Sequence, residues 1–276
     1  MDQRDNSPAG AVHPVIDRLA RRLPVAALGL RCARTPDVVR WARATGHHAV
    51  WVDLEHSAMP VDVAGALCGT AADLGLTALV RVPEREYGVV GRLLDAGASG
   101  IIFPRVETAG QAADLVAACR FPPLGHRSAI ATLPCVGYRR VPAAELYATA
   151  NRATLVKVLL ESPLGIENAE AIASVPGVDL LAIGTNDLCA ELGVPGEATH
   201  PLVREAHEAA LRACLRAGKP LAIGGVADVR YVADLIARGA APFMMTGIDS
   251  DLLAAAMRER VDLALASLET GDAARA

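Results

Sequence analysis

Residues 50–60 read VWVDLEHSAMP, and the position of the charges in this stretch is the first indication of the fold. Three apolar residues lead directly into Asp53, Glu55 and His56. A buried strand that ends in titratable side chains either reaches the surface there or delivers those side chains to a reaction site. The residues at the ends of the other apolar runs distinguish between these two alternatives.

Short apolar runs of this kind recur along the chain and alternate with amphipathic stretches of helical periodicity. Continuous runs of Val, Leu, Ile and Ala are typical of parallel strands that are covered on both faces. The runs are PVAALGL (24–30), AVWVDL (49–54), TALVRV (77–82), GIIFP (100–104), TLVKVLLE (154–161), DLLAIG (179–184), PLAIGG (220–225) and PFMMTG (242–247). Eight strands that alternate with helices predict an α/β fold, a single (β/α)8 TIM barrel. An open doubly wound sheet is the alternative, because it alternates in the same way.

The predicted barrel forms one catalytic domain over residues 15–268. Residues 1–14 are expected to be a flexible N-terminal arm, and residues 269–276 a flexible tail. A long insertion follows strand four, because residues 105–153 separate the fourth run from the fifth. Long connections inside compact domains are usually functional or disordered. The Gly, Pro and Arg content of this one suggests a lid or a subunit contact.

Composition and charge exclude several classes of function. The formal net charge is −4 and no basic block occurs, so nucleic acid and anionic membranes are not expected partners. No apolar run is long enough to span a bilayer, and the N-terminal residues do not resemble a signal peptide. The six cysteines are scattered and form no CxxC pair, which favours reduced thiols over a disulfide framework. We therefore expect a soluble, cytoplasmic protein.

Polar residues concentrate where the predicted strands end, which is the catalytic face of a barrel. Each could have a structural role alone: Asp53 or Asp187 as a helix cap, Arg81 in a rim ion pair, His56 as a structural histidine. Their joint placement on strand ends instead predicts an enzyme. The residues concerned are Asp53, Glu55, His56, Arg81, Arg105, Glu107, Glu161, Asn186 and Asp187.

Glu161 indicates a metal site, because it ends the apolar run VLL, where an unpaired carboxylate would be costly. Asp187 on the next strand end can share the required cation, and oxygen ligands suit a hard divalent ion such as Mg²⁺ or Mn²⁺. A metal-free aldolase would instead need a Schiff-base lysine. Lys157 lies four residues before Glu161, roughly 13 Å below the mouth. We expect it to pair with a buried acid near the floor.

Four longer segments together resemble the HpcH/HpaI class II pyruvate aldolases, over roughly residues 24 to 262. They are WVDLEHSAMP, FPRVETAGQAADLVAACRFPPLGHRS, LLESPLGIENAEAIASVPGVDLLAIGTNDLCAELGVPG and GAAPFMMTGIDSDLLAAA. The resemblance implies a barrel enzyme dependent on Mg²⁺, Mn²⁺ or Co²⁺. It would cleave or form a 4-hydroxy-2-oxo acid, with pyruvate and an aldehyde as its small-molecule partners.

The resemblance also implies roles for individual residues. Glu161 and Asp187 match the metal ligands, and Arg81 matches the arginine that contacts the pyruvyl oxygen. His56 matches the proton-transfer histidine, with Asp95 in LLDAG, or the nearer Asp53, as its partner. The backbone N–H groups of Gly184, Thr185, Asn186 and Asp187 would hold the pyruvate carboxylate. Members of the family commonly form homo-oligomers, as hexamers built from a trimer of dimers that exchange C-terminal helices.

The chain departs from the family pattern at several positions. Leu159 stands where a polar Gln is usual, Thr185 and Asn186 where small residues are frequent, and Arg105 where an uncharged residue is frequent. Arg105, with His126 in the insertion, would suit a second anionic group on the substrate. These departures leave an alternative open: a decarboxylase, or an enzyme that forms carbon–carbon bonds, acting on a dicarboxylic 2-oxo acid such as oxaloacetate. A non-catalytic barrel that binds a 2-oxo acid is a third reading.

Overall fold

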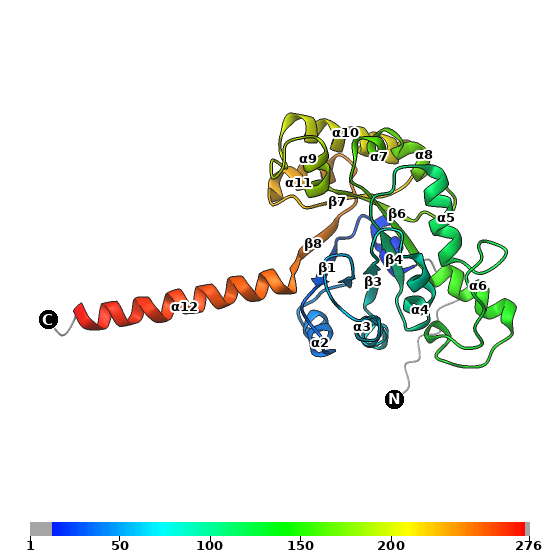
Figure 1. The fold of residues 1–276 in the computed structure, drawn as a ribbon, viewed down its shortest axis with the longest axis horizontal. Helices are drawn as coiled ribbons and strands as arrows, with labels where there is room; N and C mark the ends of the chain where they lie inside the picture. The colour runs from blue at the N-terminus through cyan, green and yellow to red at the C-terminus, as the bar shows by residue number, and fades with distance from the viewer. Residues whose placement is uncertain (1–12, 274–276) are drawn as a thin grey trace.

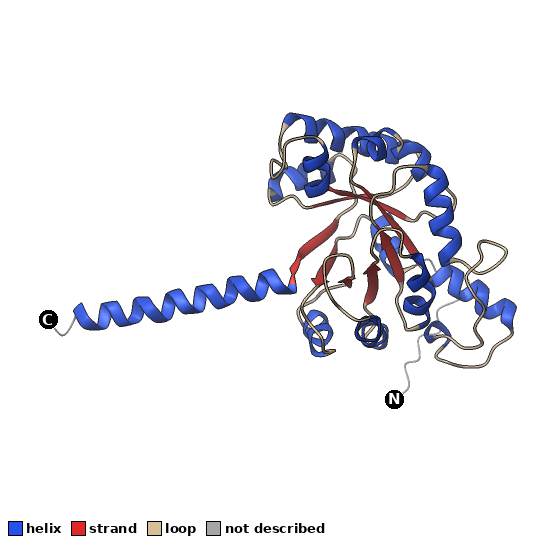
Figure 2. Ribbon diagram, viewed as in Figure 1, coloured by secondary structure: helices blue, strands red, loops and turns tan. Residues whose placement is uncertain are grey.

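The computed structural model describes residues 13–273, and its centre is a barrel of eight parallel strands (Figures 1 and 2). The strands are β1 (Val25–Leu30), β2 (Ala49–Asp53), β3 (Thr77–Arg81), β4 (Gly100–Phe103), β5 (Leu155–Leu160), β6 (Leu180–Gly184), β7 (Leu221–Gly224) and β8 (Phe243–Ile248). Each predicted run matches one strand to within one residue at either end.

The strand order settles the choice between a barrel and an open sheet. The sheet runs β7-β6-β5-β4-β3-β2-β1-β8, so β1 pairs with both β2 and β8. In a doubly wound sheet the order would reverse at an internal strand. Between β7 and β8 the Ala241 N–H donates to the Leu221 carbonyl at 2.7 Å, which almost closes the ring.

Apart from the first and the last, the helices lie between successive strands, and most of them cover the outer face of the barrel (Figure 1). They are α1 (Pro14–Ala20), α2 (Asp37–Ala44), α3 (Val61–Asp73), η1 (Tyr87–Val89), α4 (Val90–Asp95), α5 (Ala109–Cys119), η2 (Pro134–Val136), α6 (Ala143–Ala153), α7 (Pro163–Glu167), α8 (Ala169–Ala173), α9 (Thr185–Glu191), α10 (Pro201–Arg216), α11 (Val229–Ala237) and α12 (Asp249–Ala273). Among the described helices, none is long and apolar enough to cross a membrane.

Two apolar clusters bury the two faces of the sheet, one outside the barrel and one inside it. The larger one lies between the strands and the surrounding helices, as expected for parallel strands buried on both sides. The smaller one occupies the barrel interior and includes Val15 and Leu19 of α1, which pack with the first residues of β1 and β8. Helix α1 therefore closes the floor of the barrel, and the opposite end is left open.

The predicted N-terminal arm largely lies outside the described residues, but its last two positions belong to the fold. His13 is buried and its Nδ1 accepts a hydrogen bond from the Val15 N–H, so it caps α1, which begins at Pro14. At the other end, α12 continues to Ala273 through part of the predicted tail. Helix α12 projects away from the barrel instead of packing along it (Figure 1).

The insertion after strand four is present, but it cannot be a lid. It leaves α5 at Cys119 and returns to β5 at Leu155, which places it at the N-terminal face of the barrel. Phe121, Leu133 and Leu146 form a small core there, which fixes η2 and α6 against each other. Helices run antiparallel to the strands, so a segment between α5 and β5 lies opposite the mouth.

Candidate active site

A cavity of about 380 Å³ opens at the C-terminal ends of the strands and extends into the barrel. The predicted site residues on its wall are His56, Arg81, Glu161, Gly184, Thr185, Asn186 and Asp187. Side chains deeper in the barrel, among them Ile102, Ala182, Ala222 and Phe243, form the rest of the lining. A concave, largely apolar cavity with a few convergent polar groups is the usual form of a small-molecule site.

Asp53, the last residue of β2, is fully buried and holds the loop that follows it. Its Oδ1 accepts hydrogen bonds from the backbone N–H groups of Glu55 at 3.1 Å and His56 at 3.2 Å. Burial alone would raise the pKa of Asp53, but hydrogen bonds from Arg81, His56 and Arg31 hold it below its ordinary value. Asp53 therefore holds the loop that carries His56 in place, and it remains ionised.

Arg81 is locked in place by two carboxylates. Its Nε and Nη2 donate to the two Asp53 oxygens at 3.0 and 2.8 Å, and its Nη1 lies 3.0 Å from Glu55 Oε2. The guanidinium also lies over the Trp51 ring, 5.1 Å from its centroid. A bidentate arginine of this kind has little rotational freedom, so it presents a fixed positive charge to the cavity.

His56 lies at the mouth, where its side chain is 52% exposed. Its Nε2 is 3.8 Å from Glu55 Oε2, the same oxygen that pairs with Arg81. Burial raises the pKa of Glu55. The imidazole is therefore accessible from the cavity and stands beside a carboxylate.

Glu161 is only 3% exposed and stands just beyond the end of β5. Its Oε2 accepts a hydrogen bond from the Arg105 N–H at 2.8 Å, and Arg105 adopts a positive φ of 50°. Gly184 provides the space for this carboxylate, because a Cβ there would lie 2.2 Å from Glu161 Oε1. Burial, with the Asp187 and Glu55 carboxylates nearby, raises the pKa of Glu161 to about 7.

Helix α9 starts at the end of β6 and carries the other predicted site residues. Gly184 is its N-cap and brings no side chain that could cap the first turn. The Thr185 hydroxyl faces away from the solvent, 3.0 Å from Nε2 of the buried His207, whose Nδ1 is 3.0 Å from the Tyr231 hydroxyl. Burial lowers the pKa of His207 to about 4, so the ring is neutral and connects α9, α10 and α11.

The donor set fits a hard divalent cation. Glu161 is a buried carboxylate that forms no ion pair with a cationic side chain among the described residues, and Asp187 contributes a second carboxylate nearby. Within residues 13–273 no group of three or more His, Cys, Asp or Glu side chains has metal-binding geometry. A cation held by two carboxylates keeps several positions for water and substrate, as Mg²⁺ commonly does.

Two of the predicted residues lie elsewhere than expected. Asp95 ends α4, at the face opposite the mouth, where its Oδ1 accepts a hydrogen bond from Arg127 at 2.6 Å. It cannot be the partner of His56 within the same chain. The Arg105 guanidinium lies over α9, 3.2 Å from Glu191 and 3.7 Å from Asp187, and does not line the cavity. Only the Arg105 backbone N–H reaches the site, through Glu161.

Contrary to expectation, Lys157 pairs with no acid in the part of the chain that the structure describes. It is buried in the barrel and lines the cavity, with its Nζ 4.3 Å from the centroid of the Phe243 ring. The expectation assumed that a buried lysine needs a carboxylate, but burial lowers the pKa of Lys157 to about 7 and an aromatic face contacts it instead.

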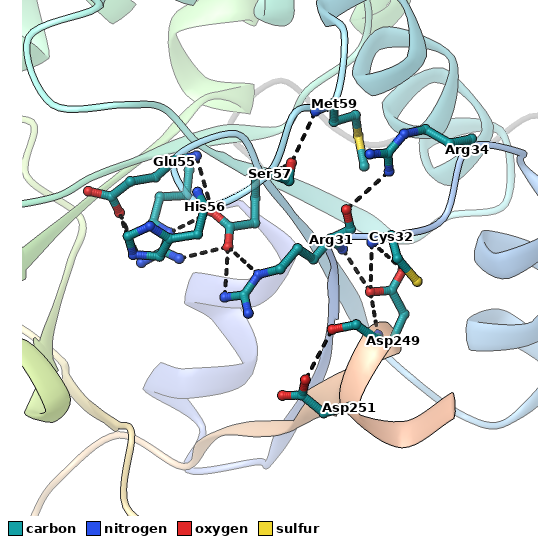
Figure 3. Close-up of polar contacts among 12 residues, drawn as sticks. Arg31, Cys32, Arg34, Glu55, His56, Ser57, Met59, Asp249 and Asp251 are labelled. Atoms are coloured by element: carbon teal, nitrogen blue, oxygen red, sulfur yellow. Dashed lines mark hydrogen bonds and ion pairs between the residues drawn. The ribbon is translucent and has the colours of Figure 1, made fainter. Parts of the chain in front are cut away.

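The sequence reasoning missed Arg31 and Asp249. Arg31 follows β1 and its Nη2 lies 3.0 Å from Asp53 Oδ2; it points from the first strand end toward the loop of Glu55 and His56 (Figure 3). Asp249, the first residue of α12, accepts hydrogen bonds from the N–H groups of Arg31 and Cys32 (Figure 3) and also from the N–H group of Ala33. Arg31 directly follows the first apolar run, so including the end of that run among the strand ends would have found it.

Comparisons with known proteins agree with this architecture. The chain is 39% identical over 233 residues to a 4-hydroxy-4-methyl-2-oxoglutarate aldolase of Chaetomium globosum, covering 83% of this chain and 87% of the relative. It is 37% identical over 216 residues to a 4-hydroxy-2-oxovalerate aldolase of Rhodococcus jostii, covering 78% of each. The crystal structure of an HpcH/HpaI aldolase from Desulfitobacterium hafniense superposes with a TM-score of 0.84 at 29% identity, covering 92% of this chain and 96% of that one.

The sequence profile of the HpcH/HpaI aldolase/citrate lyase family matches residues 32–256, which include the strands β2 to β8 and every residue of the cavity wall except Arg31. The family likeness inferred from the four sequence segments is thereby confirmed. This chain belongs to the HpcH/HpaI aldolase/citrate lyase family and is a carbon–carbon lyase.

Proposed function

We propose that the protein is a divalent-metal-dependent aldolase that cleaves a 4-hydroxy-2-oxo acid to pyruvate and an aldehyde, or forms it. The observation that carries this proposal is the buried Glu161 carboxylate, beside Asp187 and Glu55 in a cavity that also holds Arg81. Relatives named as 4-hydroxy-4-methyl-2-oxoglutarate and 4-hydroxy-2-oxovalerate aldolases support the reaction class.

Glu161 and Asp187 would hold the cation. Three carboxylates so close together repel one another, and a divalent cation would remove the cost of ionising Glu161. When bound, the cation supplies a Lewis acid that stabilises negative charge on the 2-oxo oxygen of the substrate. Mg²⁺, Mn²⁺ and Co²⁺ all suit this donor set.

The remaining groups bind and orient the substrate. Arg81, held rigidly by Asp53 and Glu55, directs its charge at the 2-oxo oxygen, where negative charge develops as the carbon–carbon bond breaks. The first-turn N–H groups of α9, at Thr185 to Asp187, receive the substrate carboxylate.

His56 accepts the proton of the 4-hydroxyl group. It stands at the mouth, belongs to the cavity wall and lies beside the Glu55 carboxylate. Asp53 acts through the backbone of the loop, by fixing the His56 N–H. Asp95 has no part in the reaction of its own chain, because α4 ends at the opposite face.

Proton exchange at pyruvate C3 in D₂O, followed by NMR, tests enolisation without knowledge of the aldehyde. We expect exchange with Mn²⁺, none after thorough chelation with EDTA, and none in Glu161→Gln. Exchange that persists unchanged after chelation would contradict the metal mechanism. Oxaloacetate decarboxylation that outpaces the cleavage of every 4-hydroxy-2-oxo acid tested would contradict the aldolase assignment and favour the alternative reaction.

We also propose that the protein is a homo-oligomer. Leu253, Met257, Val261 and Leu265 recur at every fourth position of α12 and are 56–60% exposed, while Trp41 on α2 is 67% exposed. Large apolar side chains gathered on one surface mark interaction sites. We expect a mass above that of the 28.7 kDa chain in size-exclusion chromatography with light scattering. A monomer at micromolar concentration would contradict this proposal.

A further inference from the structure

Lys157 is a charged side chain deep in the barrel that the proposed chemistry does not use. It lies in the middle of β5 and is 4% exposed. Within the described residues it makes no hydrogen bond or ion pair, and its Nζ contacts the face of the Phe243 ring at 4.3 Å. Lys219, the other lysine, donates a hydrogen bond to the Val178 carbonyl instead.

The surroundings of Lys157 leave room for a ligand. It shares the 380 Å³ cavity with Glu161, and the nearby part of the wall is formed by Ala182, Ala222 and Ile102, which offer no counter-charge. Burying an ammonium group without a partner is costly. Burial, with repulsion from Arg81, accordingly lowers the pKa of Lys157 to about 7. A carboxylate placed here would supply the missing counter-charge.

We propose that Lys157 is an anion site at the floor of the cavity, which binds a second carboxylate of the substrate and so selects dicarboxylic 2-oxo acids. The inference rests on the proposed function, which fixes the 2-oxo end of the substrate near Glu161. Glu161 and Lys157 are four residues apart on one strand, about 13 Å along it. An extended lysine side chain and a five-carbon diacid together bridge this separation.

The distribution of polar groups in the cavity favours a substrate whose 2-oxo end lies at the mouth and whose second carboxylate lies at the floor. The mouth of the cavity carries the Glu161 and Asp187 carboxylates, and its floor carries the Lys157 amine, which pairs with no acid among the described residues. A neutral, apolar chain end at the floor would leave Lys157 without a partner. A buried donor left unpaired discriminates strongly between a ligand that satisfies it and one that does not.

Isothermal titration with a matched pair of ligands tests the site, with Mn²⁺ present throughout. 2-Oxoglutarate and 2-oxovalerate have the same five-carbon chain and differ only in a carboxylate or a methyl at the far end. Neither has a 4-hydroxyl group, so neither can undergo retro-aldol cleavage. We expect the protein to prefer 2-oxoglutarate by about 10- to 100-fold.

Lys157→Met should abolish this preference while leaving the affinity for 2-oxovalerate within about twofold. Lys219→Met is the matched control and should retain the preference. Pyruvate C3 exchange in Lys157→Met shows that the variant is folded and that the mouth is intact. A preference that survives in Lys157→Met, or that is absent in the wild type, overturns the inference.

Two further outcomes keep this inference distinct from the proposed function. If both ligands bind with the expected preference but no exchange occurs, the aldolase proposal fails and the anion site stands. The nucleophilic alternative is tested by cyanoborohydride reduction in the presence of pyruvate. A stable pyruvyl adduct on Lys157, found by peptide mass spectrometry, would mean that the amine forms an imine and would overturn the anion site.

Discussion

Glu161→Gln should make the metal-free protein more stable at high pH, although it removes the residue on which the proposed activity depends. The buried carboxylate has a folded pKa of about 7 against an ordinary value of 4.5. The folded state therefore prefers the protonated carboxyl, and ionising it at pH 8.5 costs folding free energy. Gln keeps the acceptor for the Arg105 N–H and carries no charge.

The sign and the size of this stability change follow from the linkage between protonation of Glu161 and folding. Since the folded pKa is raised, the contribution of Glu161 is fully present below pH 4.5 and is lost as the pH rises through 7. A difference between 4.5 and about 7 corresponds to about 3 kcal/mol as an upper limit. Glu161→Gln should thus match the wild type near pH 4.5 and exceed its unfolding free energy by up to about 3 kcal/mol at pH 8.5.

Bound metal should make the wild type more stable than Glu161→Gln at pH 8.5. Mn²⁺ at a thousand times its dissociation constant stabilises a protein that binds it by about 4.1 kcal/mol, which exceeds the deficit of the wild type, and the variant should gain little. Urea unfolding at pH 4.5 and 8.5, with EDTA or with Mn²⁺, measures all four cases. Glu191→Gln, which changes an exposed carboxylate on α9, is the control and should show no such reversal. A Glu161→Gln variant that is less stable than the wild type at pH 8.5 in EDTA would refute the reasoning.

Two further substitutions probe the frame of the site. Gly184→Ala places a Cβ 2.2 Å from Glu161 Oε1, so Mn²⁺ affinity measured by calorimetry should fall at least about tenfold; unchanged affinity would contradict the close packing. Thr185→Val leaves a nitrogen of the buried His207 without its partner and should lower the unfolding free energy by about 1–3 kcal/mol in urea; a neutral result would show that this contact does not support α9.

The sequence predicted the strands well because their signal is local. A continuous run such as TALVR (Thr77–Arg81) is buried on both faces, and few other elements have that composition. The insertion was harder, because its Gly, Pro and Arg content says nothing about which end of the barrel it covers. That follows from topology: a segment between α5 and β5 must lie at the N-terminal face.

The sequence located residues that directly follow the strands, but it could not predict in which direction each side chain points. Glu161, Arg81 and His56 line one cavity, as their positions after strands imply. Asp95 was assigned through the family pattern, but it lies at the end of a helix, and helix ends in a barrel face away from the mouth. Arg105 follows a strand, but its positive φ turns the N–H toward Glu161 and the guanidinium toward α9.

Lys157 shows why distance along a strand is a poor guide to function. Its position in the sequence predicted a depth of roughly 13 Å below the mouth and a buried acid as its partner. Small side chains at Ala182 and Ala222 leave the interior open instead, and the cavity that begins at Asp187 continues down to the amine. The mouth then attracts a cation and the floor an anion. A substrate with a carboxylate at each end could bind at the mouth and also pair with Lys157 at the floor. A monocarboxylic 2-oxo acid would leave Lys157 without a partner.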